Sequence, residues 1–183
     1  MITFHNIVTE SQEVIEKVRE WRNRDDIRKW MYDSHLITEE EHLAWIESLS
    51  KEALDSSVKY KRVVWVIYDS QGPIGIVNLQ DINWKHLTAS WGIYIAEKTL
   101  DKPAGLQAIK FIAEKAFNDF KLEKLNSTVF ANNKKALIFN QTCGMRPQGV
   151  FRSEIQFDPL LRIDLFSFGL TRKEWEEWNT QKA

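Results

Sequence analysis

The sequence is poor in several features that mark particular classes of protein. Its single cysteine, Cys143, excludes an internal disulfide framework and fits a reducing compartment. The 25 lysines and arginines nearly balance the 26 aspartates and glutamates, so the net charge of -1 gives no argument for nucleic acid or for an acidic membrane surface. The 7 glycines and 4 prolines are too few for collagen or for most low-complexity chains.

Targeting and metal-binding patterns are missing as well. No run approaches the ~20 apolar residues that span a bilayer. Residues 1–10 lack the basic and apolar regions of a signal peptide. The four histidines show no ligand spacing, so we expect no metal site. Together these features predict a cytoplasmic protein.

The chain does have the material for one hydrophobic core. It contains 183 residues, 43% of them hydrophobic, which suits one domain and is too little for two comfortable ones. We therefore expect a single domain over residues 1–183. The 8 tryptophans are unusual, and such side chains either pack a core or line pockets for flat groups.

The periodicity of the apolar residues changes along the chain. Helical spacing begins at Ser11, continues over 25–32 and resumes at Thr38, which forms a capping box with Glu41. Period-two patterns then predict an antiparallel meander with strands at 60–68, 74–82 and 87–95. The remaining pattern predicts, in order, a helix over 106–120, a strand at 125–131, a helix from 136 that stops at Gly144, strands near 149–157 and 162–170, and a helix from Thr171. This order predicts a mixed α/β domain, with helices flanking one central mixed sheet.

The junction between Tyr94 and Gln107 connects a predicted strand to a predicted helix. The N–H groups at a helix start lack partners and, with the macrodipole, bind anions. Lys102 adds positive charge, and Gly105 would let a phosphate approach the backbone closely. An ordinary connection with a surface lysine is the alternative interpretation.

A second segment follows the strand at 125–131. It reads Asn133-Lys134-Lys135-Ala136-Leu137-Ile138-Phe139-Asn140-Gln141-Thr142-Cys143-Gly144-Met145. Together with Lys102-Pro103-Ala104-Gly105-Leu106-Gln107, it resembles the GNAT superfamily of N-acetyltransferases. That family has a phosphate loop of the form Arg/Gln-x-x-Gly-x-Gly/Ala and a later Asn-x-x-Ala segment ending in Gly-Phe. The resemblance covers nearly the whole chain, and it implies the GNAT fold and acetyl-CoA as the acetyl donor.

The resemblance also implies which residues contact acetyl-CoA. The backbone of Ile93, Tyr94 and Ile95 would meet the pantetheine arm. Asn133 would contact that arm or cap the helix beneath it, and capping is what local chemistry alone favours. The pyrophosphate would lie on the loop formed by Lys102, Pro103, Ala104, Gly105, Leu106 and Gln107.

The N-terminal segment resembles one branch of the family more specifically. The strings Trp21-Arg22-Asn23 and Asp26-Ile27-Arg28-Lys29-Trp30-Met31-Tyr32, with Ile37-Thr38 and Glu41-His42, are similar to UDP-4-amino-4,6-dideoxy-N-acetyl-β-L-altrosamine N-acetyltransferases of pseudaminic acid synthesis. The tail at 149–152 and 170–175 also resembles GNATs that acetylate ribosomal-protein N-termini. The first branch implies acetylation of the 4-amino group of a nucleotide-linked amino-deoxy sugar, and a homodimer is compatible with it.

Such an acceptor needs cations near its diphosphate and aromatic walls around its rings. Solvated helix charge is the alternative interpretation for the arginines, and core packing is the alternative for the tryptophans. The candidates for contact with the acceptor are Arg22, Asn23, Arg28, Trp30, Tyr32 and Trp91, with Lys29 as a further cation.

Two positions depart from the family's usual proton-handling residues. Ser90 stands where many members have a glutamate, and Asn140 where they have a tyrosine. One possibility is that Thr88, Ser90 or Tyr94, which share a strand face, move the proton through water, with Asn140 donating to the thiolate. The other residues considered for this role are Asp81, His86 and Glu154.

Two further possibilities do not require a dedicated base. The amine is partly neutral and positioning supplies the rate, or the chain only binds acyl-CoA or a nucleotide sugar. Cys143 has no base nearby in the sequence and is expected to be a small core residue. This favours direct attack within a ternary complex over a ping-pong route.

Overall fold

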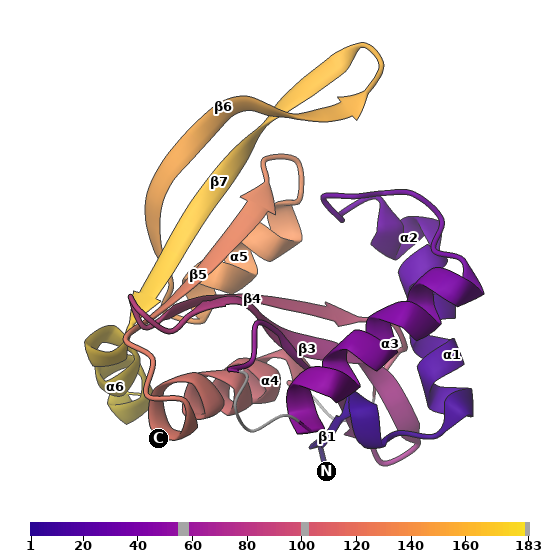
Figure 1. Ribbon diagram of the computed structural model, residues 1–183. Coiled ribbons are helices and arrows are strands. Elements are labelled where there is room, and N and C mark those ends of the chain that lie inside the picture. Colours follow the sequence, from indigo (N-terminus) through magenta and orange to yellow (C-terminus); the bar gives the residue numbers. More distant parts are fainter. Residues whose placement is uncertain (55–58, 100–102, 182–183) are drawn as a thin grey trace. The chain divides into compact units, whose positions relative to one another are not determined.

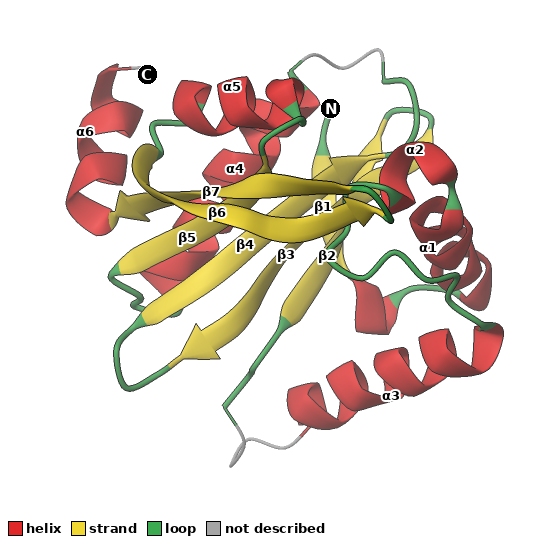
Figure 2. Ribbon diagram, turned by 90° about the horizontal axis from the view of Figure 1, so that it is seen from above, coloured by secondary structure: helices red, strands yellow, loops and turns green. Residues whose placement is uncertain are grey.

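The computed structural model describes residues 1–54, 59–99 and 103–181. Its strands form one seven-stranded mixed sheet in the order β1-β2-β3-β4-β5-β7-β6, and helices flank it (Figures 1 and 2). The mixed α/β fold is therefore confirmed. The chain divides into two compact units, the first made of Met1–Ile82 with Gly92–Ile112 and the second of Asn83–Trp91 with Ala113–Ala183. The single domain stays a prediction.

The first unit holds the N-terminal helices and the start of the sheet. Two elements, β4 (Thr88–Ile95) and α4 (Ala104–Glu114), pass from one unit into the other, and β3 enters the second unit with its last residue, Asn83. The other elements of this unit are β1 (Thr3–Asn6), a 3-10 turn η1 (Ile7–Thr9), α1 (Gln12–Asn23), α2 (Asp25–Arg28), α3 (Glu39–Leu54), β2 (Val63–Asp69) and β3 (Gly72–Asn83).

Strand β2 lies at the centre of the first unit and is buried on both faces. Val64 and Val66 belong to a core that α1, α2 and α3 complete with apolar side chains such as Val18 and Leu49. The alternate residue Trp65 meets Phe111 of α4 edge to face, with ring centroids 5.4 Å apart. Because successive strand residues point to opposite faces, a continuous apolar run suits this two-sided burial.

Capping side chains fix the helix starts in both units. Glu41 accepts the backbone N–H of Thr38 at 2.8 Å, and the hydroxyl of Thr38 accepts the N–H of Glu41 at 3.2 Å. Thr171 and Glu174 form the same reciprocal pair at the start of α6. Both capping boxes were expected from the sequence, since the motif is local and needs no tertiary partner.

The second unit contains the C-terminal half of the sheet. The β4 residues Thr88–Ser90 pair in parallel with Lys124–Asn126, whereas β5–β7 and β7–β6 are antiparallel. Figure 1 shows β6 and β7 as one long twisted hairpin, and β6 is exposed along most of its length. The elements are η2 (a π-helix, Lys115–Asp119), β5 (Lys124–Phe130), α5 (Lys134–Thr142), β6 (Arg146–Asp158), β7 (Leu161–Thr171) and α6 (Arg172–Gln181).

Aromatic packing joins the helices of the second unit. Phe117 meets Trp175 with ring centroids 5.4 Å apart, and both side chains are buried. Gly144 follows α5 with φ +81°, and a Cβ there would lie 2.8 Å from Trp178. Glycine is therefore required both by the left-handed conformation and by the close indole, which confirms the predicted helix stop.

Some predicted elements differ from the observed ones. Strand β1 and the η1 turn were not predicted, because four residues are too few to show a clear period. Helix α2 ends at Arg28 instead of Tyr32. The helix predicted over 106–120 begins at Ala104 and becomes a π-helix at Lys115.

Candidate active site

The start of α4 carries the predicted phosphate loop. Lys102 lies outside the described residues, and Pro103 precedes the helix as an exposed residue. The first helical bond of this turn runs from the N–H of Gln107 to the carbonyl of Pro103 at 3.2 Å. The N–H groups of Ala104, Gly105 and Leu106 come before it, so helix geometry gives them no acceptor within α4. This is an arrangement that can receive an anion.

The end of β4 is held tightly against β3. A Cβ at Gly75 would lie 2.2 Å from the carbonyl oxygen of Tyr94, so only glycine permits this approach. The carbonyl of Ile74 accepts both N–H groups that follow β4, from Ala96 at 2.7 Å and from Glu97 at 3.0 Å. The backbone of Ile93, Tyr94 and Ile95 is thus part of a rigid strand end.

Thr88 and Ser90 are half-buried and alternate with the buried residues Ala89 and Trp91. They therefore share one face of β4, as the sequence predicted. Short hydroxyl side chains on one face can hold a water molecule between them. Their part in proton transfer stays a prediction.

Tyr94 has its hydroxyl directed at helix α1. The hydroxyl donates to the backbone carbonyl of Val18 at 3.5 Å, and the ring packs against the core of the first unit. Burial raises the pKa of Tyr94 above its usual value. The phenol is therefore protonated at neutral pH and cannot serve as a base there.

Asn133 and Asn140 both lie in the second unit and both bond to helix α5. The side chain of Asn133 accepts the N–H of Ala136 at 3.2 Å, so the capping interpretation is confirmed. Asn140 is 4% exposed and donates through Nδ2 to the carbonyl of Ala136 at 2.9 Å. Its Oδ1 is buried and has no hydrogen-bond partner in the described chain. Asn140 was expected to donate a hydrogen bond to a thiolate. The atom left without a partner is instead an oxygen, which accepts hydrogen bonds.

Two arginines of the first unit hold the loop between α2 and α3, residues 29–38. Arg22 donates through Nη2 to the carbonyl of Asp33, and Arg28 donates through Nη1 to the carbonyl of Ser34 at 3.0 Å. Arg28 also pairs with Asp25 at 2.5 Å. Burial lowers the pKa of Arg22, although a guanidinium stays charged at neutral pH.

Each of these arginines has one buried nitrogen that makes no hydrogen bond with the described residues. Nη1 of Arg22 and Nε of Arg28 have no hydrogen-bond partner within residues 1–54, 59–99 and 103–181. A buried donor without a partner is costly, so an oxygen atom that reached either of these two donors would be bound favourably. Both residues were predicted from the sequence as cations for the acceptor.

The other predicted acceptor residues occupy different environments. Asn23 uses both ends of its side-chain amide on the backbone of Ile37, so its expected contact with the acceptor is replaced by a loop contact. Trp30 is half-buried with the Lys29 ammonium 5.1 Å from its ring centroid. Tyr32 is 69% exposed, so it can reach a ligand from the surface of the loop.

Trp91 does not form an exposed wall. It is 5% exposed, its indole N–H donates to the sulfur of Met145 at 3.0 Å, and its ring lies 6.2 Å from that of Phe139. The core interpretation of this tryptophan therefore replaces the acceptor role. Strand alternation explains the difference, because Trp91 points to the face opposite Ser90.

One residue that holds the loop was not predicted. Arg19 donates through Nη1 to the carbonyl of Ile37 at 3.1 Å while it pairs with Glu16. Arg19 lies one helical turn before Arg22, so the shared face of α1 was a signal available in the sequence.

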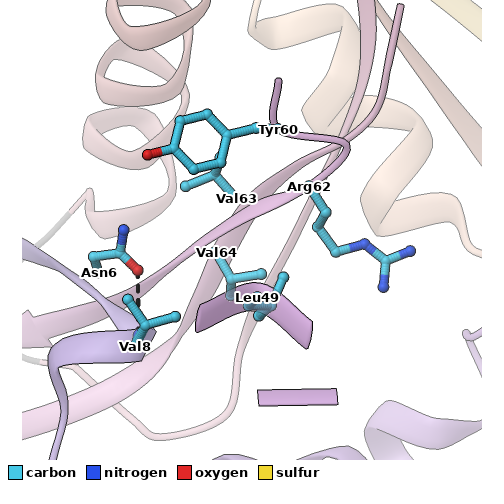
Figure 3. Close-up of a pocket in the computed structure, with 7 residues that line it drawn as sticks. All are labelled: Asn6, Val8, Leu49, Tyr60, Arg62, Val63 and Val64. Carbon is cyan, nitrogen blue, oxygen red and sulfur yellow. Dashed lines mark hydrogen bonds between the residues drawn. The ribbon is translucent and has the colours of Figure 1, made fainter. Parts of the chain in front are cut away.

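One pocket of the first unit is too small for a cofactor. Figure 3 shows a pocket of the first unit lined by Asn6, Val8, Leu49, Tyr60, Arg62, Val63 and Val64. It has room for about one water molecule, so it cannot hold a cofactor. Among the described residues no cluster of histidine, cysteine or acidic side chains is arranged to hold a metal ion, and no helix is long and apolar enough to cross a membrane.

Comparison with known proteins defines the class. Residues 7–146 match the acetyltransferase (GNAT) domain family, so the chain belongs to the GNAT acetyltransferases. It is an enzyme that takes its acetyl group from acetyl-CoA. A curated relative is Acetyltransferase PseH of Campylobacter jejuni subsp. jejuni serotype O:23/36, 31% identical over 137 residues, which covers 75% of this chain and 80% of the relative. Acetyltransferase PseH of serotype O:2 is 30% identical over 137 residues, with the same coverage.

Solved structures show the same fold at lower identity. The spermidine N-acetyltransferase of Vibrio cholerae, in complex with CoA and spermine, has a TM-score of 0.80 and 20% identity, covering 96% of this chain and 98% of its own. A probable acetyltransferase has a TM-score of 0.79 and 17% identity, covering 95% of this chain and 94% of its own. These likenesses confirm the fold and carry no information on the acceptor.

Proposed function

We propose that this acetyltransferase transfers acetyl to the 4-amino group of a nucleotide-linked amino-deoxy sugar. The observation that supports this acceptor is the pair of buried, unsatisfied N–H groups on Arg22 and Arg28. A diphosphate offers several oxygen acceptors to such guanidinium donors. The relatives named Acetyltransferase PseH support the same choice. The sequence strings that resemble the pseudaminic acid branch include both arginines.

Two arginine side chains of this region argue against a polyamine acceptor. Spermidine is a polycation, and Arg22 and Arg28 would repel it at close range. Arg28 forms an ion pair with Asp25, and Arg22 has no ion-pair partner in the described chain. An anionic group therefore suits these two guanidinium groups better than a cationic one does.

The described residues also suit the acetyl donor. Acetyl-CoA supplies the acetyl group activated as a thioester. In the first unit, the loop Pro103–Gln107 would hold the pyrophosphate through the N–H groups of Ala104, Gly105 and Leu106, which have no acceptor within α4. The backbone of Ile93–Ile95 would align the pantetheine arm.

The chemical step requires two proton movements. The amine must lose a proton before its lone pair attacks the carbonyl carbon, and the sulfur leaving that carbon must gain one. We assign the first movement to a water held by Thr88 and Ser90 on their shared face of β4. Positioning of the amine then supplies much of the rate, because no strong base is required when the proton passes to solvent.

Release of CoA distinguishes the possible functions. A UDP-linked 4-amino sugar should cause release of free CoA from acetyl-CoA, whereas spermidine and a ribosomal-protein N-terminal peptide should not. Release with the peptide alone would point to an N-terminal acetyltransferase. Binding of acetyl-CoA without release by any acceptor would point to a binding module. We place the reaction in the cytoplasm, and a homodimer stays a prediction that light scattering checks.

A further inference from the structure

The end of β4 is tied to α1 and α2 by three side chains that the sequence did not single out for a role. The indole N–H of Trp21 donates to Oε1 of Glu97 at 2.6 Å. Arg24 donates through Nη1 to the carbonyl of Ala96 at 2.9 Å and lies 3.7 Å from the same Glu97 oxygen. Trp21, Arg24 and Glu97 are named here the strand-end clamp.

Each member of the clamp is held in place by other contacts. Trp21 is 2% exposed and is packed within the core of the first unit. Asp26 binds Arg24 through two bonds of 3.0 and 2.7 Å, which fixes the direction of the guanidinium. Glu97 is anchored through its backbone N–H to the carbonyl of Ile74 at 3.0 Å.

The clamp acts on a piece of backbone that is also constrained from the other side. The close approach of Gly75 to Tyr94 and the bonds to Ile74 fix β4 relative to β3. The clamp fixes the same strand end relative to α1 and α2. Backbone held from two directions has little freedom, so a ligand that binds along it pays little ordering entropy.

We propose that Trp21, Arg24 and Glu97 are positioning residues that preorganise the end of β4 for acetyl-CoA. The inference rests on the proposed contact between the β4 backbone and pantetheine. The same four-residue stretch, 21–24, also holds the loop at 29–38 through Arg22 and Asn23. Residues at the C-terminal end of α1 therefore hold two parts of the first unit in place. These parts are the end of β4 and the loop at 29–38, where we propose that the acceptor binds.

Titration calorimetry with acetyl-CoA tests the clamp without any acceptor. Glu97→Ala leaves the buried indole N–H without an acceptor and frees the strand end, and its Kd should rise by about three- to tenfold. Glu97→Gln keeps an oxygen for the indole and should return the Kd to within about twofold of the parent. Glu47→Ala, which removes an exposed carboxylate paired with Lys51 on α3, is the matched control and should leave the Kd unchanged.

A double-mutant cycle shows whether the clamp works as one unit. Trp21→Phe removes the indole donor and keeps an aromatic ring, so adding it to Glu97→Ala should raise the Kd no further. A merely structural role would lower the Tm of these variants and leave the Kd of the folded protein unchanged, and that result would overturn the proposal. Gly105→Glu, which blocks the α4 loop, is titrated alongside. If Gly105→Glu weakens acetyl-CoA binding and Glu97→Ala does not, the positioning role of the strand-end clamp is wrong. The proposed pyrophosphate contact with the loop at the start of α4 would still hold. An unchanged Kd in Gly105→Glu would instead contradict the proposal that this loop binds the pyrophosphate.

Discussion

Asn23 pairs with the backbone of Ile37 in both directions. Its Nδ2 donates to the carbonyl of Ile37 at 2.9 Å, and its Oδ1 accepts the N–H of Ile37 at 2.8 Å. The side-chain amide thus satisfies the peptide groups of one loop residue as a neighbouring strand would. With Arg22 and Arg28 on the carbonyls of Asp33 and Ser34, this pairing makes the loop at 29–38 a fixed part of the first unit.

Removal of the Asn23 amide should loosen this loop. Asn23→Ala leaves both peptide groups of Ile37 to find water, and the free energy of unfolding should fall by about 1–3 kcal/mol. We expect the KM for the acceptor to rise while the Kd for acetyl-CoA stays within about twofold. Steady-state kinetics with a separate acetyl-CoA titration measures both. An equal loss of donor affinity would show that the loop does not act on the acceptor alone.

Trp30 is expected to contact the acceptor from the same loop. Its half-buried ring lies beside the ammonium group of Lys29, and the two side chains together present an aromatic face and a cation. Trp30→Ala should raise the KM for the nucleotide sugar and leave acetyl-CoA binding nearly intact. If donor affinity fell just as much, Trp30 would belong to the core and the proposed acceptor region would be wrong.

His42 should make the stability of the protein depend on pH. Its ring N–H donates to the carbonyl of Ile15 at 2.9 Å, and burial lowers the pKa of His42 below its usual value. As the pH falls through about 6.5, the unfolded chain therefore takes up a proton more readily than the folded protein does. The free energy of unfolding decreases as the pH is lowered through this range. Urea titrations at pH 7.5 and 5.5 should show this loss, and His42→Gln should reduce it.

His35 provides the opposite control. A hydrogen bond to Asp33 raises the pKa of His35, so its contribution to stability is full below the usual value and is lost as the pH rises through the raised one. His35→Gln should therefore steepen the loss between pH 7.5 and 5.5. A slope that neither substitution changes would contradict both assignments.

Ser90 is expected to share proton transfer with Thr88 and water. Ser90→Ala should lower kcat by much less than the ~100- to 10,000-fold typical of a lost general base. Pre-steady-state rates at saturating acetyl-CoA give the value for the chemical step. A loss of several orders of magnitude, with the fold and the donor affinity intact, would make Ser90 the central proton handler.

Local motifs were predictable from the sequence, whereas contacts between distant segments were not. The capping boxes and the stop at Gly144 depend on residues within one or two helical turns. Asn133 was likewise expected as a possible cap. The bond between Trp21 and Glu97 joins residues 76 positions apart, and nothing in either local pattern indicates it.

Residue type also misled where the strand face decides the role. Trp91 has a side chain of the type that lines binding pockets. On β4 it points to the face opposite Ser90, and there it is buried in the core beside Met145. Tyr94 lies on the predicted face, yet its hydroxyl is directed at Val18. Asn23 has a polar side chain typical of a binding site, and the loop backbone uses it fully. These roles follow from tertiary packing, which propensity and spacing do not encode.

The position of the new amide bond in the product tests the proposed function most directly. The protein is incubated with acetyl-CoA and a UDP-linked 4-amino-deoxy sugar, and the product is examined by mass spectrometry and two-dimensional NMR. We expect one added acetyl group, with its carbonyl carbon correlated to the proton on C4 of the sugar. A sugar recovered without acetyl, under conditions in which spermidine or an N-terminal peptide is acetylated, would contradict the proposal.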